Sequence, residues 1–167
     1  MKYLITICAF CLMFSISACS DNDDNGNDIP SVGNIKMKLD GSNWEASANS
    51  ISMTIQGAQQ IAVGGSKVVN LQNNEFDIVT VTFVGTGGVT TGDYAHDSSL
   101  DSYVQVTFSK GQATIENTWF SVSAEATVTS VSSDNIQGSF SATLERDNHP
   151  NIVITDGVFN SPIMATR

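Results

Sequence analysis

The chain has 167 residues, 41% of them hydrophobic and 14% charged, with 17 acidic against 7 basic side chains and a formal net charge of −10. This length suits one globular domain, which can bury enough surface to fold without disulfides or metals. The few Lys and Arg residues form no cluster. The composition therefore excludes nucleic-acid binding, because phosphate contacts require cations.

Residues 1–18 have the pattern of a signal peptide: Lys2, a mostly apolar run to Ile16, then two small residues. The run is shorter than the ~20 apolar residues of a transmembrane helix. The sequence Ile16-Ser17-Ala18-Cys19 resembles a bacterial lipobox. This resemblance implies that Cys19 becomes the acylated first residue of the mature chain. The alternative is an ordinary secretory signal followed by an incidental cysteine.

Residues 19–33 are predicted to be a flexible tether that begins at the lipidated Cys19, because Ser20 to Asp28 contain no apolar residue. Their acidic character resembles the export signal of surface-displayed lipoproteins in Bacteroidota. It implies an outer-membrane protein that faces outward and contacts the membrane through its acyl chains. The spacing of Asp21 to Gly26 matches half of a calcium loop, but the twelfth position is Val32, so we interpret the segment as a spacer.

Two of the three cysteines, Cys8 and Cys11, lie in the predicted leader. Only Cys19 would remain after cleavage. The mature domain is therefore predicted to have no disulfide, thiolate metal site or cysteine nucleophile.

Residues 34–167 are predicted to form one antiparallel all-β domain, a sandwich or flattened barrel of about ten strands with essentially no helix. The chain has 14 Ile and 15 Val against 6 Leu, and β-branched residues favour strands. Strand-length runs are separated by Gly, Asn, Asp and Ser, a spacing typical of sandwiches and barrels. The runs are 34–39, 44–48, 51–56, 59–63, 67–71, 76–84, 102–109, 112–116, 119–130, 136–145, 151–155 and 157–160.

The first hairpin has two candidate turns, because apolar and polar residues alternate on both sides of Asp40-Gly41-Ser42. A type II′ turn at Gly41-Ser42 would pair Leu39 with Trp44, whereas a type I′ turn at Asp40-Gly41 would pair Leu39 with Ser42. We expect the first register, because it leaves less apolar surface unmatched, and we expect Trp44 in the core.

A second hairpin joins 119–130 to 136–145. Its apolar faces match when Ala126 lies opposite Phe140. This register requires either an odd loop at 131–135 or a bulge near Val131-Ser132.

The run Leu39-Asp40-Gly41-Ser42-Asn43-Trp44-Glu45-Ala46 is similar to the opening D-G-x-x-W-x-A hairpin of a broad group of uncharacterised Bacteroidota lipoproteins. Residues 136–144 resemble that group's I-x-G-x-F-x-x-x-L strand, and 154–160 resemble its I-T-x-G-x-F ending. Residues 51–120 show no such resemblance. Because these motifs consist of turn and core residues, the resemblance implies a fold and supplies no catalytic residues.

No pattern indicates catalysis. The two histidines, His96 and His149, lie in predicted loops, and the chain has no G-x-S-x-G motif. We therefore predict a non-enzymatic protein without cofactor or metal. A hydrolase that uses a pair of loop carboxylates remains the alternative.

The segment 92–103 joins two predicted strands and has two interpretations. It is either a sugar-contacting or calcium-binding loop, or a solvated connection whose tyrosines anchor it to the sheet. The candidate ligand-binding residues there are Asp93, Tyr94, Asp97, Asp101 and Tyr103.

Trp119 is a further candidate ligand contact, because an indole ring beside polar groups can stack on a sugar. It can equally fill the core. Phe120 must face the opposite side of the strand, so one of the two rings is expected to point outward.

These features predict a surface lipoprotein that acts as a non-catalytic binding module for a glycan or protein ligand. The alternative is a lipocalin-like carrier of a small apolar ligand inside a closed barrel. A structural coat protein is not separated from the first by any sequence feature.

Overall fold

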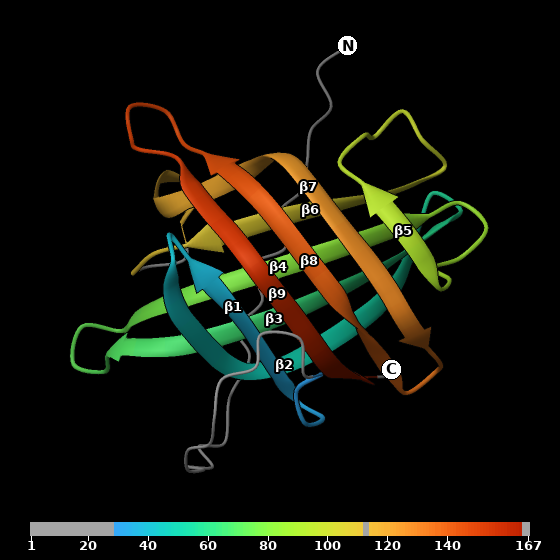
Figure 1. Cartoon of the computed structure of the whole chain (residues 1–167), viewed down its shortest axis with the longest axis horizontal. Coiled ribbons are helices and arrows are strands. Elements are labelled where there is room, and N and C mark those ends of the chain that lie inside the picture. The colour runs from blue at the N-terminus through green and yellow to red at the C-terminus, as the bar shows by residue number, and fades with distance from the viewer. Residues whose placement is uncertain (1–28, 112–113, 165–167) are drawn as a thin grey trace.

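The structure, a computed structural model, describes residues 29–111 and 114–164 (Figure 1). Its regular elements are strands, apart from one turn of 3-10 helix at Ile115–Asn117. The predicted all-β class is therefore confirmed. The strands are β1 (Asn34–Leu39), β2 (Ser42–Ile55), β3 (Ala58–Asn70), β4 (Glu75–Gly85), β5 (Gly92–Ala95), β6 (Ser102–Ser109), β7 (Thr118–Val131), β8 (Asn135–Glu145) and β9 (Ile152–Met164).

Eight strands close into an antiparallel barrel in the order β1-β2-β3-β4-β6-β7-β8-β9. The last strand returns to the first, with Ile35 opposite Phe159. Figure 1 shows β7, β8 and β9 crossing in front of β3, β4 and β6 at a large angle, so the barrel is flattened into two layers. Of the two predicted architectures, a sandwich or a flattened barrel, the structure therefore has the flattened barrel.

The seam between β6 and β7 positions β5. These two barrel strands pair only over three residues each, from Thr107 opposite Phe120 to Ser109 opposite Thr118. Beyond that point β7 pairs with β5 instead. Where the strands part, the Ser121 hydroxyl accepts a hydrogen bond of 3.1 Å from the Val106 N–H. The face formed by β7, β8 and β9 is consequently one strand wider at this end.

The barrel interior is packed with aromatic and β-branched side chains. Phe83, Phe108 and Phe159 are fully buried. The Phe83 ring centroid lies 5.2 Å from that of Tyr94 and 5.6 Å from that of Phe159, which contacts Phe140 at 6.3 Å. Trp44 is buried, as predicted. Alternation along each strand thus supplies one continuous core.

The predicted turn of the first hairpin is wrong. Leu39 pairs with Ser42, and both Asp40 (φ +48) and Gly41 (φ +79) have the left-handed conformation of a type I′ turn. The two registers differ by two residues and keep the same side chains inward, so apolar matching could not decide between them. The Asp40 carboxylate also accepts a hydrogen bond of 2.8 Å from the Val153 N–H, which stabilises the observed turn.

The predicted register of the second hairpin is confirmed at its centre, where Ala126 lies opposite Phe140. The expected irregularity is a bulge between Val128 and Ser130, slightly earlier than Val131-Ser132. A second bulge between Ser121 and Ser123 turns Val122 out of the apolar face.

Several predicted strands have different bounds. Neighbouring runs merge into the long strands β2, β3 and β9, because partners on both sides continue the hydrogen-bond ladder. The predicted strand at 112–116 is wrong where the structure describes it. There, the Thr114 carbonyl accepts bonds from the Asn117 N–H at 3.0 Å and the Thr118 hydroxyl at 2.7 Å, which close a helical turn.

The predicted leader, Cys19 and the tether up to residue 28 lie outside the described residues. The end of the predicted tether contacts the barrel. The Pro30 carbonyl accepts a hydrogen bond of 3.1 Å from the Asn160 side chain, and the Gly33 N–H donates to the Asn160 carbonyl at 2.7 Å. Pro30 and Gly33 are thus held against β9, and the first strand begins at Asn34.

Candidate functional site

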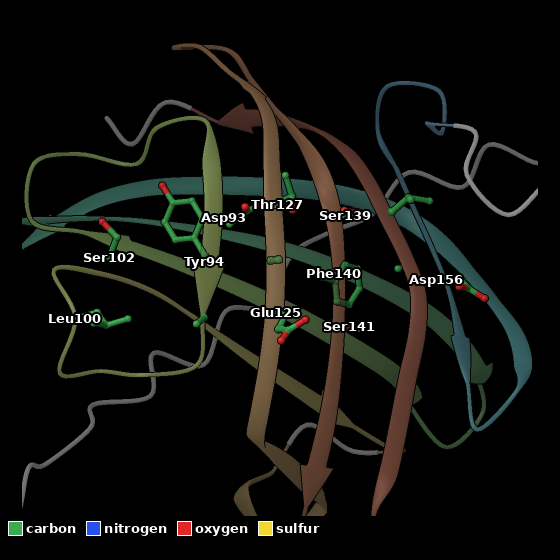
Figure 2. Close-up of a pocket in the computed structure, with 14 residues that line it drawn as sticks. Asp93, Tyr94, Leu100, Ser102, Glu125, Thr127, Ser139, Phe140, Ser141 and Asp156 are labelled. Carbon is green, nitrogen blue, oxygen red and sulfur yellow. Dashed lines mark hydrogen bonds between the residues drawn. The ribbon is translucent and has the colours of Figure 1, made fainter.

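The outer face of β5, β7, β8 and β9 contains a hollow of about 660 Å³ (Figure 2). Along β7, Glu125 lies on this face while its neighbour Ala126 is buried. Ser139 and Ser141 likewise flank the buried Phe140 on β8. The side chains that border the hollow outside the core are Asp93, Ala95, Leu100, Ser102, Glu125, Thr127, Ser139, Ser141, Asp156 and Val158.

A bulge in β9 shapes the far side of the hollow. Ser141 on β8 faces two β9 residues, Thr155 and Asp156, and Asp156 has a left-handed φ of +52°. Gly157 follows and pairs with Phe140 of β8, and a Cβ atom there would lie 2.5 Å from the Phe140 carbonyl oxygen and 2.6 Å from its ring. The glycine therefore makes room for the buried Phe140 ring on the core side, while the bulge redirects the strand and the small Ser139 and Ser141 side chains form the floor of the hollow.

Carboxylates dominate the charge of the hollow. The Asp93 carboxylate accepts a hydrogen bond of 2.7 Å from the Thr127 hydroxyl, which holds it over β7. Glu125 is exposed two residue pairs further along the β5–β7 ladder. Asp156 is paired with Lys38 of β1 at 2.9 Å. Since no Lys or Arg lines the hollow itself, its β5–β7 side is negatively charged.

A second hollow of about 240 Å³ continues along the same face and shares Glu125 and Ser141 with the first. Its lining includes Val153, which is 44% exposed. Val122 is 50% exposed and Phe120 is 41% exposed, and both lie further along β7 toward its start. The face thus passes from an acidic end to an apolar end.

Tyr94 anchors the chain to the sheet, as one of the two interpretations predicted. Its side chain is buried and its ring packs edge-on against Phe83. Its hydroxyl accepts a hydrogen bond from the Thr90 N–H and donates one to the Thr90 carbonyl, each 2.9 Å long. Only Asp93 of the candidates in 92–103 has an exposed side chain that lines the hollow.

The other candidates of this segment lie apart from the floor of the hollow. Asp97 and Asp101 are exposed in the loop after β5, and Tyr103 is half-buried on β6. Hydrogen bonds from the Ser99 hydroxyl and backbone N–H, together with the charge of His96, lower the pKa of Asp97 from its ordinary value of 3.8. Within residues 29–111 and 114–164, no group of three or more His, Cys, Asp or Glu side chains is arranged to hold a metal ion.

Trp119 points into the molecule and Phe120 outward. The indole is 7% exposed, and its N–H donates a 3.0 Å hydrogen bond to the Pro150 carbonyl. The Arg146 guanidinium lies 4.0 Å from the ring centroid and covers one face. Trp119 therefore does not line the hollow and has no exposed face for a sugar to stack on.

The two histidines lie on different connections. His96 directly follows β5, and its N–H donates to the Ala124 carbonyl at 2.9 Å. His149 is in the loop between β8 and β9, where its ring contacts Trp119 edge-on and hydrogen-bonds Arg146. Neither histidine lines either hollow.

Sequence reasoning missed most of the hollow, namely Glu125, Thr127, Ser139, Ser141 and Asp156. The signal was the polar half of the alternation in 119–130 and 136–145. That pattern indicates which side chains face outward, but it does not indicate which other strands lie beside these two, because this depends on how the barrel closes.

Comparisons of the chain with protein-family models, curated proteins and solved structures found no match. In the described part of the chain, no helix is long and apolar enough to span a membrane.

Proposed function

We propose that this protein is an acylated outer-membrane lipoprotein, displayed on the cell surface, that binds a glycan or protein ligand without transforming it. Support for the anchor comes from the lipobox-like sequence ending at Cys19 and the acidic residues that follow it. Two or three acyl chains hold a protein stably at a membrane, whereas one does so only marginally.

The observation that carries the binding role is the hollow on the outer face. Hydroxyl and carboxylate groups of Thr127, Ser139 and Glu125 project from adjacent strands of a closed barrel, which hold them in a fixed arrangement. Binding sites combine such a rigid concave surface with a few polar groups that orient the ligand.

The packing of the interior favours an external site over the lipocalin-like carrier. A carrier needs space for its ligand inside the barrel. Here the Phe159 ring contacts both the Phe83 and the Phe140 rings within that interior.

Binding is tested with the full chain in detergent, screened against a glycan array and a panel of proteins. Glu125→Gln and Asp93→Asn should each weaken a genuine hit, while Glu116→Gln, an exposed glutamate outside both hollows, should not. Hits that keep their affinity in both hollow variants would contradict this site.

The anchor is tested by fractionation and surface proteolysis. Cys19→Ala should release a soluble protein, because acyl chains supply ~0.8 kcal/mol per buried CH₂ and the acidic chain has little attraction for anionic headgroups. Neutralising Asp21, Asp23 and Asp24 should keep the protein membrane-bound but shield it from protease added to intact cells. A Cys19→Ala protein that still sediments with membranes would exclude acylation as the anchor.

A further inference from the structure

The two hollows form one groove that runs along β7 and β8, because Glu125 and Ser141 belong to both linings. The groove follows β7 from Thr127 to Ser123, which is four residue steps or roughly 13 Å at ~3.3 Å per residue, and the half-exposed Val122 adjoins its end. A surface this long exceeds one sugar ring and suits an extended segment of chain.

The acidic end of the groove has a spacing that suits one cationic group. In the β5–β7 register Asp93 lies opposite Thr127, and Ala95 lies opposite Glu125. Asp93 and Glu125 are therefore diagonal neighbours, a relation that separates their Cβ atoms by roughly 7 Å. Their carboxylates can approach a single guanidinium or ammonium group from two sides.

The apolar end lies about 10 Å further along β7, which is three residue steps from Glu125 to Val122. Val122 is half exposed because it occupies a bulge, and Val153 is exposed across β8, where Thr143 pairs with both Ser123 and Val153. This end offers aliphatic surface to a partner.

The chemistry of the groove distinguishes a protein segment from a glycan. The aromatic residues in its lining, Tyr94 and Phe140, are 5% and 4% exposed, so neither offers a ring face to a sugar. Negative charge at one end and exposed aliphatic side chains at the other complement a basic residue and an apolar residue on one chain.

From this arrangement we infer that the groove binds an extended segment of a partner protein, with Arg or Lys at Asp93 and Glu125 and an aliphatic side chain at Val122 and Val153. The inference rests on the proposed function, because it names the ligand class of the same site. Side chains of an extended segment return to one face every second residue. The midpoint between Asp93 and Glu125 is level with Ala126, four residue steps of β7 from Val122. The apolar residue is therefore four positions from the basic one, a separation of ~13 Å.

The test uses fluorescent Gly/Ser-based nonapeptides and the full chain in detergent micelles, with empty micelles as a blank. One peptide carries Arg and Leu four residues apart, and three others have Arg→Glu, Leu→Ser or a two-residue spacing. The first should bind most tightly and should weaken as salt screens the charge.

Two substitutions test the acidic and the apolar end of the groove separately. Glu125→Gln should weaken the Arg/Leu peptide about tenfold, the scale of one lost charge-assisted hydrogen bond. Val122→Ser should weaken it about threefold, because half of that side chain is already exposed. The matched controls are Glu116→Gln in the 3-10 turn and Val68→Ser on β3, which neither line the groove nor adjoin its end on β7, and they should leave affinity unchanged. Melting temperatures would show that all four variants fold.

The outcomes separate this inference from the proposed function. If glycans bind in a manner sensitive to Asp93→Asn while no peptide binds, the inference is overturned and the proposed function stands. If the peptide binds but Val122→Ser has no effect, lengthwise docking is overturned. If no peptide, glycan or protein hit responds to Asp93 or Glu125 substitution, both fail.

Discussion

The two faces of β7, β8 and β9 show opposite chemistry from residue to residue. Ala126 and Phe140 face the interior and are buried, whereas their neighbours Glu125, Ser139 and Ser141 line the outer hollow. Inner residues must match the shape of the opposite wall, because protein interiors are close-packed. Outer residues meet solvent, so their identity is open to selection for a ligand. Alternation along these strands thus separates the residues that pack the core from the residues that line the proposed binding site.

The glycines on these strands show how tightly the inner face is packed. A Cβ atom at Gly138 would lie 2.2 Å from the Thr127 carbonyl oxygen and 2.9 Å from the Phe159 ring. The wall of the barrel and an aromatic ring therefore leave no space for a side chain there, while the adjacent Ser139 is exposed.

The largest effect is expected from Gly138→Val, which should reduce the free energy of unfolding by about 3 kcal/mol, since overpacking displaces both backbone and ring. The same replacement one residue later, Ser139→Val, should change it by no more than about 0.5 kcal/mol. Urea denaturation of the two proteins compares the faces directly. Equal losses would show that parity does not separate their roles.

An intermediate effect is expected from the buried polar pair within the barrel. The Ser50 and Ser161 hydroxyls are 2.6 Å apart and fully buried, next to the short parallel contact between β2 and β9. Ser161→Ala should cost about 1–3 kcal/mol, because it leaves the Ser50 hydroxyl without its partner.

The double variant Ser50→Ala/Ser161→Ala should be more stable than either single variant, since it removes both polar groups together. A double-mutant cycle measures this coupling. Additive losses would mean that the hydroxyl pair contributes nothing beyond its separate side chains.

The smallest effect is expected at Asp97, which is exposed in the loop after β5. Ser99→Ala removes the largest cause of its lowered pKa, so the Asp97 pKa should rise toward 3.8, as carboxyl NMR titration would show. Because the pKa of Asp97 is lower in the folded than in the unfolded protein, its ionised carboxylate stabilises the folded state at pH values above the unfolded-state pKa. This stabilisation is lost as the pH falls through the folded-state pKa. The wild type and Ser99→Ala should therefore differ in how their stability changes with pH only at acidic pH. An unchanged Asp97 pKa would contradict the role of Ser99.

Much of the fold could be predicted from sequence because its signals are local. Period-two alternation identifies strands and their buried faces, as at Trp44 and in the pairing of Ala126 with Phe140. The first turn shows the limit. Two registers differing by two residues bury the same side chains, so turn conformation at Asp40 and Gly41 and a bond from Val153 decide between them.

The candidate site was much less accessible from sequence. Asp93 was identified from its loop, but Tyr94 and Trp119 are buried, because residues distant in the chain cover them. Glu125 and Asp156 gave no local signal beyond polarity. The position of Asp156 in a bulge depends on how β9 meets β8.

The sequence by itself therefore determined the all-β class, the core face of most strands and the register of one hairpin. These properties follow from side-chain alternation between neighbours in the chain. Only the tertiary structure decided that β1 meets β9, that β5 fills the gap beside β7, and that their outer face is hollow. The partners lie far apart in the chain, with Ile35 of β1 opposite Phe159 of β9 and Asp93 of β5 opposite Thr127 of β7, and no local pattern encodes which distant strands will meet.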